Sequence, residues 1–433
     1  MERVWSTDLI THAGRHVRLA GWLHRYRQLS HIGFLVLRDA RGLVQIVVDD
    51  PETAALLGRL ANESVLSVTG QAVANPQAPG GAELHGPEIT VLSEAVAPPF
   101  DLFRPTLAAQ LPTILDHASV ALRHPAVRAR HRLAAALTEG FRAILTADGF
   151  TEIHTPKIVA AATESGANVF PIDYFGRTAY LAQSPQLYKQ VMVGVFERVF
   201  ETGPVFRAEP HDTPRHLNEY ISLDAELGFI ADERDVMAVL GRTLRSMFER
   251  LPDRLGGDLV LAGAILPAIP DEIPAIHFTD ARDQVAGGLG DERERHEPDL
   301  SPAGERWLGE WALRTHGSDL LFVTGYPMSK RPFYTHPDPD RPGFSRGFDL
   351  LFRGLELVTG GQRLHHLSDY HAALTERGMV PEPFSWYLDA FRHGMPPHGG
   401  FAIGLERLVA RLAGRTNLRE VTLFPRDINR LTP

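Results

Sequence analysis

Short runs of alternating apolar and polar residues dominate the first hundred positions of the chain. Five of these runs have the alternation and the branched or aromatic side chains of a strand, with turn-forming residues between them: residues 17–23, 34–38, 43–48, 63–73 and 88–92. Five short strands within about ninety residues are typical of a small closed barrel. This pattern therefore predicts an N-terminal domain built from β-structure.

The pattern ends at residues 97–99, where two prolines interrupt it. We expect a barrel of the oligonucleotide-binding (OB) type over residues 1–99 and a hinge over residues 100–125. Apolar residues then recur at helical spacing over residues 127–145. The remaining residues alternate predicted strands and helices, and this change of pattern predicts a second domain over residues 126–433. The remaining residues contain no Rossmann or P-loop glycine fingerprint.

Composition excludes several kinds of function. The chain has no cysteine, so disulfides, thiol catalysis and cysteine-based zinc sites are ruled out. The formal net charge of −9 argues against a protein that coats DNA in general, although a local basic patch can still meet one RNA. The first ten residues lack the apolar core of a signal peptide, and no apolar run is long enough to span a membrane. We therefore expect a cytoplasmic protein.

Paired charges mark two antiparallel strands predicted near residues 205–226. Arg207 and Glu209 are expected on one face of the first strand, and Asp224 and Glu226 on one face of the second, since side chains repeat every second residue. Arginine neutralises phosphate, and carboxylates hold metals or amines, so the pattern suits a nucleotide site. By itself, however, it favours an ordinary cross-strand ladder of salt bridges.

Two further segments join a strand and a helix. In Gly399–Val409, glycines at a strand end would let a ligand approach the backbone, and Arg407 in the first helical turn can stack on a base or reach a phosphate. A glycine-packed strand–helix turn explains this segment equally well. Gly149–Pro156 runs from a helix end into a strand and a proline, and taken alone it is an ordinary junction.

Together, in this order and spacing, the three segments resemble the signature motifs of class II aminoacyl-tRNA synthetases. Gln183–Gln190, Phe206–Glu209, Gly360–Arg363 and Leu423–Asp427 look like the aspartyl subgroup in its compact archaeal form. The resemblance runs the whole length of the chain. It implies an α+β protein in which an OB-fold barrel precedes a catalytic domain made of an antiparallel sheet flanked by helices.

The resemblance implies a pocket for L-aspartate. Lys189, one of only three lysines in the chain, and Arg363 would hold the side-chain carboxylate. Arg207 would bridge the α-carboxylate and the α-phosphate of ATP. The remaining aspartate-binding residues would surround the ammonium and orient the ligand: Glu164 in a lid loop, Gln186, Asp224 and Thr359.

The resemblance also implies an ATP site with magnesium as cofactor. Arg207, Glu356 and Arg407 would be the catalytic residues, and Glu356 with Thr359 would bind Mg²⁺. Tyr220 and Arg407 would stack on the two faces of adenine. The other residues expected around ATP are Glu209, Arg215, His216, Leu217, Gly404, Leu405 and Glu406.

In the barrel, Phe34 resembles the aromatic that stacks an anticodon base and Gln45 the side chain that reads it, with His24 and Arg25 beside them. Without the resemblance, Phe34 would be assigned to the barrel core and His24 to the solvated surface. The partners implied are tRNA(Asp), ATP, L-aspartate and a second copy of the chain, since Pro156 matches a motif at the class II dimer interface. Strict relatives carry Trp where this chain has His24, so charging of tRNA(Asn) as well stays open.

Two alternatives remain. An asparaginyl-tRNA synthetase shares the fold and the motifs, but Lys189 would then face an uncharged amide, and Asp224 follows the aspartyl pattern. A catalytically inactive tRNA-binding paralogue is the other alternative. The presence of Arg207, Glu356, Arg363 and Arg407 argues against it.

Overall fold

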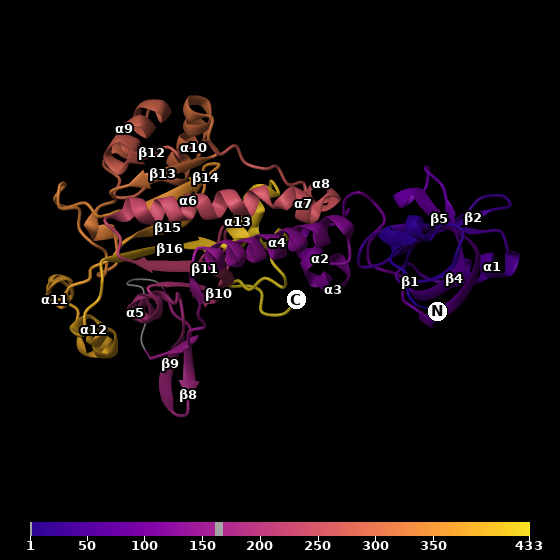
Figure 1. Cartoon of the computed structure of the whole chain (residues 1–433), viewed down its shortest axis with the longest axis horizontal. Coiled ribbons are helices and arrows are strands. Elements are labelled where there is room, and N and C mark those ends of the chain that lie inside the picture. The colour runs from indigo at the N-terminus through magenta and orange to yellow at the C-terminus, as the bar shows by residue number, and fades with distance from the viewer. Residues whose placement is uncertain (1, 161–167) are drawn as a thin grey trace. The chain divides into compact units, whose positions relative to one another are not determined.

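The computed structural model describes residues 2–160 and 168–433. The chain forms two compact units, residues 1–125 and residues 126–433 (Figure 1). Within the described residues, no helix combines the length and the apolar character needed to cross a membrane.

A closed five-stranded barrel forms most of the first unit, as the strand pattern predicts. Its strand order is β1-β2-β3-β5-β4, with bounds β1 (His16–Gln28), β2 (Gly33–Arg38), β3 (Leu43–Val48), β4 (Val65–Ala74) and β5 (Ala82–Ser93). Alternate side chains point into the barrel, and Leu35, Ile46 and Leu84 are fully buried there. The alternation thus supplies the core of this unit.

Four local features differ from the predictions. β1 is longer than predicted because it continues through a β-bulge, where the pairing with β2 shifts between Leu23 and Arg25. β5 begins at Ala82 rather than at residue 88. Helix α1 (Pro51–Arg59) was not predicted; Asp50 caps its first turn and proline occupies its first position. Residues 100–125, predicted as a hinge, contain α2 (Leu111–Asp116) and α3 (Ala118–Ala121).

A sheet of eight strands organises the second unit. Its order is β12 (Ala275–His277), β13 (Leu320–Thr324), β14 (Gly347–Phe352), β15 (Glu356–Gln362), β16 (His398–Gly404), β11 (Glu219–Gly228), β10 (Arg198–Phe206) and β6 (Thr151–Glu152). The inner pairs are antiparallel, as expected, but the two edge pairs, β12 with β13 and β10 with β6, are parallel. The sheet is therefore mixed rather than purely antiparallel.

Long amphipathic helices cover one face of this sheet (Figure 1). In α4 (Pro125–Ala147), Leu133, Leu137, Phe141 and Leu145 repeat every four residues and are fully buried. They join side chains of α6 (Glu233–Glu249), α13 (Leu405–Leu412) and the sheet in one hydrophobic core. This core fixes the strands whose other side chains form the site.

Shorter elements surround the sheet. A small sheet has the order β7-β9-β8, with bounds β7 (Ile158–Val159), β9 (Arg177–Leu181) and β8 (Pro171–Tyr174). The remaining α-helices are α5 (Gln186–Phe196), α7 (Leu251–Leu255), α8 (Gly257–Ala262), α9 (Phe278–Leu289), α10 (Pro302–His316), α11 (Leu367–Glu376) and α12 (Ser385–Arg392).

Candidate active site

A buried cluster of charges lies between α5 and β11. Asp224 and Glu226 share one face of β11, and both are almost fully buried. Lys189, in the first turn of α5, is 1% exposed, and its Nζ lies 3.0 Å from Asp224 Oδ1 and 3.3 Å from Glu226 Oε2. The Lys189 ammonium also donates to the backbone oxygen of Phe401 at 3.3 Å.

Arg363 completes the cluster from the end of β15. Its Nε donates to Glu226 Oε1 at 2.9 Å, and its Nη2 donates to the backbone oxygen of Gly400 at 3.0 Å and to Gln186 Oε1 at 3.5 Å. Burial would raise the pKa of Glu226, but the charges of Arg363 and Lys189 together lower it below its usual value. Glu226 therefore stays ionised and holds two cations in place.

Glu226 is a site residue that the sequence analysis did not assign. The two-residue spacing placed it on the same face as Asp224, but nothing local showed that two cations would converge on it. Four predicted aspartate-pocket residues, Gln186, Lys189, Asp224 and Arg363, are thus brought together around it. Glu164, predicted for the same pocket, lies outside the described residues.

Glycine at position 400 makes room for this carboxylate. A Cβ there would lie 2.1 Å from Glu226 Oε2 and 2.1 Å from the backbone oxygen of Ala225, far closer than atoms can approach. The carboxylate therefore lies directly against the backbone of β16, where the Gly400 carbonyl also receives Arg363.

We predict that Gly400→Ala lowers the free energy of unfolding by about 1–3 kcal/mol through overpacking. It should also raise the KM for aspartate more than that for ATP, because Glu226 must move. The control is Gly287→Ala in α9, where an added Cβ meets nothing within 4 Å. That variant should be as stable as the wild type, or more stable by up to about 1 kcal/mol. Urea denaturation and substrate kinetics measure both effects, and equal behaviour of the two variants would contradict the assignment.

A polar cavity of about 220 Å³ adjoins the charge cluster. Ser222 lines it and donates through Oγ to Asp224 Oδ2 at 2.5 Å, which connects the cavity with the cluster. Thr359, predicted to bind aspartate and Mg²⁺, also lines it. So do most residues predicted to bind ATP: Arg207, Glu209, Arg215, His216, Leu217, Tyr220, Glu356, Gly404, Glu406 and Arg407. The cavity therefore brings together three separate segments of the chain, within residues 207–222, 356–359 and 402–418.

Arg207 and Glu209 do not lie on a strand face, contrary to the prediction. β10 ends at Phe206, where it pairs with Glu219, and the chain then leaves the ladder. The backbone N–H of Arg207 donates to Asn218 O at 2.9 Å, and its guanidinium lies 5.7 Å from the centre of the Tyr220 ring. The Arg207 side chain lines the cavity together with residues of the ladder such as Tyr220 and Ser222.

Glu356 and Thr359 line the cavity, and the carboxylate of Asp349, which does not, interacts with both. Thr359 Oγ1 donates to Glu356 Oε1 at 3.3 Å, and Arg407 Nη1 donates to the Glu356 backbone oxygen at 3.0 Å. Asp349 stands opposite Thr359 in the β14–β15 ladder. Burial and the negative charge of Glu356 together raise the pKa of Asp349 to about 6, although the positive charge of Arg331 acts in the opposite direction.

Asp349 was also missed by the sequence analysis. Its signal was a single carboxylate inside β14, a strand that is otherwise apolar and fully buried. Arg331 partly compensates it, with Nη1 and Nη2 each 3.1 Å from one carboxylate oxygen.

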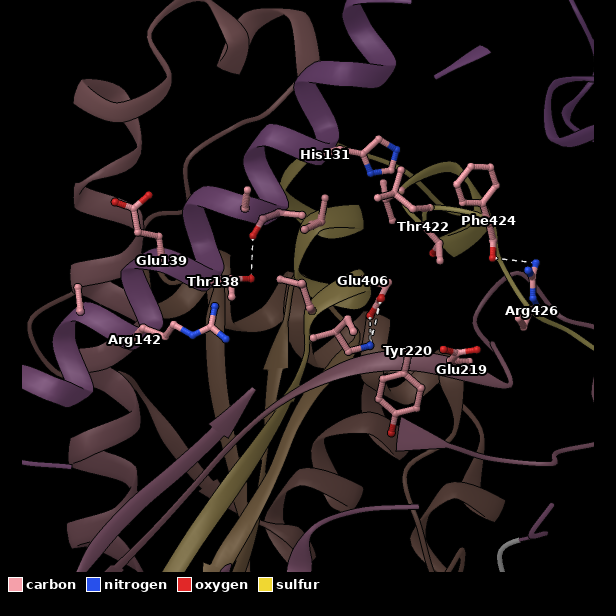
Figure 2. Close-up of a pocket in the computed structure, with 18 of the residues that line it drawn as sticks. His131, Thr138, Glu139, Arg142, Glu219, Tyr220, Glu406, Thr422, Phe424 and Arg426 are labelled. Carbon is pink, nitrogen blue, oxygen red and sulfur yellow. Dashed lines mark hydrogen bonds between the residues drawn. The ribbon is translucent and has the colours of Figure 1, made fainter. Parts of the chain in front are cut away.

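A larger cavity of about 1010 Å³ lies beyond Glu406 (Figure 2). The α4 helix and the segment 421–426 form its walls, and Tyr220 and Glu406 belong to both cavities. The N–H of Ile221 donates to both carboxylate oxygens of Glu406, at 3.1 and 3.2 Å, and burial raises the pKa of Glu406 to about 7. Glu406 thus anchors the start of β11. Leu405, predicted for the ATP site, lines this larger cavity instead, because its side chain packs with the hydrophobic core.

A third cavity, of about 510 Å³, lies on the barrel and includes Phe34 and Gln45. Gln45 Nε2 donates to Glu83 Oε2 at 2.9 Å, so Glu83 is a further polar group there. His24 and Arg25 are not among the described residues that line it. His24 is 5% exposed and occupies the β-bulge, so it is not a solvated residue, and the Arg25 guanidinium lies 4.4 Å from the Phe103 ring centre.

Known proteins resemble this chain over its whole length. A Thermus thermophilus protein named aspartate--tRNA(Asp/Asn) ligase is 49% identical over 432 residues, with both chains fully covered. A Deinococcus radiodurans protein of the same name is 47% identical over 439 residues, covering 100% of this chain and 99% of its own. Among solved structures, asparaginyl-tRNA synthetase from Pyrococcus horikoshii in complex with asparaginyl-adenylate has a TM-score of 0.93 and 32% identity, with both chains fully covered.

Two family models cover the two units. Residues 17–92 match the OB-fold nucleic acid binding domain, which confirms the predicted barrel type. Residues 110–428 match tRNA synthetases class II (D, K and N), well over half of the chain. With this match, and with relatives identical at nearly half of all positions, the chain belongs to the class II aminoacyl-tRNA synthetases of the D, K and N group.

Proposed function

We propose that this synthetase activates L-aspartate with ATP and transfers the aspartyl group to tRNA(Asp), and to tRNA(Asn) as well. The observation that carries the proposal is the buried arrangement of Lys189 and Arg363 around Glu226. With Asp224, which also pairs with Lys189, the two cations and two carboxylates of the cluster sum to zero. Once the ammonium group of aspartate neutralises Asp224, one positive charge remains for the side-chain carboxylate of aspartate. An asparagine amide would leave that charge unmatched in a buried site, which is unfavourable.

The rest of the amino acid also finds complementary charges. Asp224, beside Lys189, is suited to the ammonium group, and Arg207 at the cavity edge is suited to the α-carboxylate. Gln186 orients the ligand from the first turn of α5. Each charge of aspartate then has a partner in the site. The names of the Thermus and Deinococcus relatives support the same amino acid.

The first reaction step needs no protein base, because the α-carboxylate of aspartate is ionised at neutral pH. Its oxygen attacks the α-phosphorus of ATP, the bond to the bridging oxygen breaks, and pyrophosphate leaves. Arg207 holds the carboxylate and a phosphoryl oxygen together and stabilises the charge that develops there. Tyr220 and Arg407 stack on the two faces of the adenine, and the Glu209 carboxylate accepts a hydrogen bond from the adenine amino group. In the second step a ribose hydroxyl of the terminal tRNA adenosine attacks the aspartyl carbonyl, and AMP leaves.

Magnesium, when bound, neutralises the phosphate charge. Glu356, Asp349 and Thr359 would hold it, since carboxylate and hydroxyl oxygens are the donors that this hard cation prefers. The described residues contain no group of three or more His, Asp or Glu side chains placed to bind a metal. This fits a cation that relies on one or two carboxylates and on the phosphates of its nucleotide.

Pyrophosphate exchange with aspartate and with asparagine, measured separately, tests the proposal. Exchange that depends on aspartate supports it. Exchange that prefers asparagine would make the chain an asparaginyl-tRNA synthetase, and no exchange with either amino acid would favour the non-catalytic paralogue.

We predict that the purified enzyme charges tRNA(Asp) and tRNA(Asn) with aspartate at comparable rates. The two anticodons differ only in their last base, which is C in one and U in the other. His24 occupies the bulge of β1, and three residues further along the same strand Arg27 lines the cavity that contains Phe34 and Gln45. His24→Trp should shift the bulge and favour tRNA(Asp), while leaving exchange unchanged. Side-by-side aminoacylation of the two transcripts measures both. A wild-type preference for tRNA(Asp) of about a thousandfold, roughly 4 kcal/mol, would contradict the prediction.

We also infer that the enzyme is a cytoplasmic homodimer. Pro156 matches the motif found at class II dimer interfaces. Leu423 and Phe424, which line the larger cavity beside α4, have exposed apolar side chains. Figure 2 shows Phe424 there, and exposed apolar surface of this kind marks association sites. Light scattering should give twice the mass of one chain.

A further inference from the structure

Glu305 lies behind the nucleotide cavity and contacts two of its walls. Its Oε2 is 2.7 Å from Arg215 Nη2, in the loop between β10 and β11. The same oxygen accepts the backbone N–H of Glu356, at the start of β15, at 3.3 Å. Arg215 and Glu356 both line the cavity, whereas Glu305 does not.

The position of Glu305 is fixed by close packing of α10. Ser301 caps the helix by accepting the N–H of Gly304. Further along, a Cβ at Gly309 would lie 2.3 Å from the backbone N of Gly354, so the helix touches the turn that precedes β15. Gly354 itself has a φ of +71° and would bring a Cβ within 2.7 Å of Arg306 Cα. Two glycines therefore set the first half of α10 against the backbone that leads to Glu356.

The carboxylate of Glu305 is buried and paired with Arg215. A glutamate in the first turn of a helix is usually solvated, yet Glu305 is 8% exposed. Its carboxylate is satisfied by the Arg215 guanidinium, whose side chain is 32% exposed and open to the cavity. The pair therefore joins one buried side chain, Glu305, to one that lines the cavity, Arg215.

We propose that Glu305 is a positioning residue for ATP. It holds the Arg215 guanidinium and the backbone of Glu356 at a fixed separation. An arginine suited to the phosphates of ATP and a carboxylate proposed to bind Mg²⁺ are then in place before the nucleotide arrives. A group fixed in advance loses less freedom on binding, which strengthens binding. This inference rests on the proposed function, because it takes the cavity to be the ATP site.

The test is Glu305→Gln, which keeps the size of the side chain and an acceptor for the Glu356 N–H but removes the charge. The KM for ATP in pyrophosphate exchange should rise about tenfold, as expected for loss of a charge-assisted hydrogen bond. The KM for aspartate should stay the same. The matched control is Glu310→Gln on the same helix, whose side chain is 72% exposed and pairs only with Arg314 among the described residues. It should change neither constant.

A double variant separates positioning from a general effect on the fold. If Glu305 acts through Arg215, then Glu305→Gln combined with Arg215→Ala should have the ATP KM of Arg215→Ala alone. Additive effects would overturn the proposal, as would an ATP KM in Glu305→Gln that is unchanged or lowered. If Glu305→Gln does not fold, Glu305→Asp replaces it, because its side chain is shorter by one methylene and places the carboxylate further from Arg215. The same rise in the KM for ATP is expected. Absence of pyrophosphate exchange by the wild type with either amino acid would reject the proposed function. Even then, calorimetric titration with ATP would still test the role of Glu305, because it measures ATP binding directly.

Discussion

Replacing Arg363 by leucine is expected to abolish aspartate-dependent pyrophosphate exchange and to lower the stability of the enzyme at the same time. Activity is lost because the side-chain carboxylate of aspartate loses one of its two cations. Stability is lost because Glu226 is fully buried and Arg363 contributes its shortest ion pair, at 2.9 Å. Breaking a buried pair by removing one partner costs about 3–5 kcal/mol. Lys189 still lies 3.3 Å from Glu226, which places the expected loss near the lower end of that range.

The double variant Arg363→Leu/Glu226→Gln separates the two effects. Removing the uncompensated carboxylate should restore part of the free energy of unfolding, whereas exchange should stay undetectable because the cation is still missing. Urea denaturation and exchange assays on the same preparations measure both quantities. Near-normal exchange in Arg363→Leu would reject the assignment of the aspartate pocket.

Replacing Lys189 by methionine should weaken aspartate activation and narrow its lead over asparagine. Without the ammonium, Asp224 and Glu226 face Arg363 alone, and the cluster changes from neutral to negative. A negative site disfavours a second carboxylate but not an amide. We expect kcat/KM for aspartate to fall about a thousandfold, and its ratio to that for asparagine to fall about a hundredfold, or roughly 3 kcal/mol.

Lys330→Met provides the control for this change. Lys330 is exposed at the surface, so its replacement removes the same charge without touching the cluster. It should leave both specificity constants as they are. A ratio of the two constants in Lys189→Met equal to that of the wild type would mean that Lys189 does not discriminate by charge.

Local pattern determined much of the architecture. Alternation of apolar residues gave the five barrel strands, because each strand buries every second side chain. The four-residue repeat gave α4, and the charged strands gave the β10–β11 pair with its polar loop. The motifs then indicated the family, and with it most of the residues that line the polar cavity of about 220 Å³.

Tertiary structure alone decided which charged side chains pair with one another in the site. Arg363 and Glu226 lie 137 residues apart in sequence, and Glu305 and Arg215 lie 90 apart. The end of β10 at Phe206 likewise depends on where the pairing with β11 stops. A local pattern shows which face of a strand a side chain takes. It cannot show which side chain from another strand or helix will meet it, because that depends on the order of strands in the sheet and on the close contacts that glycines such as Gly400 and Gly309 permit.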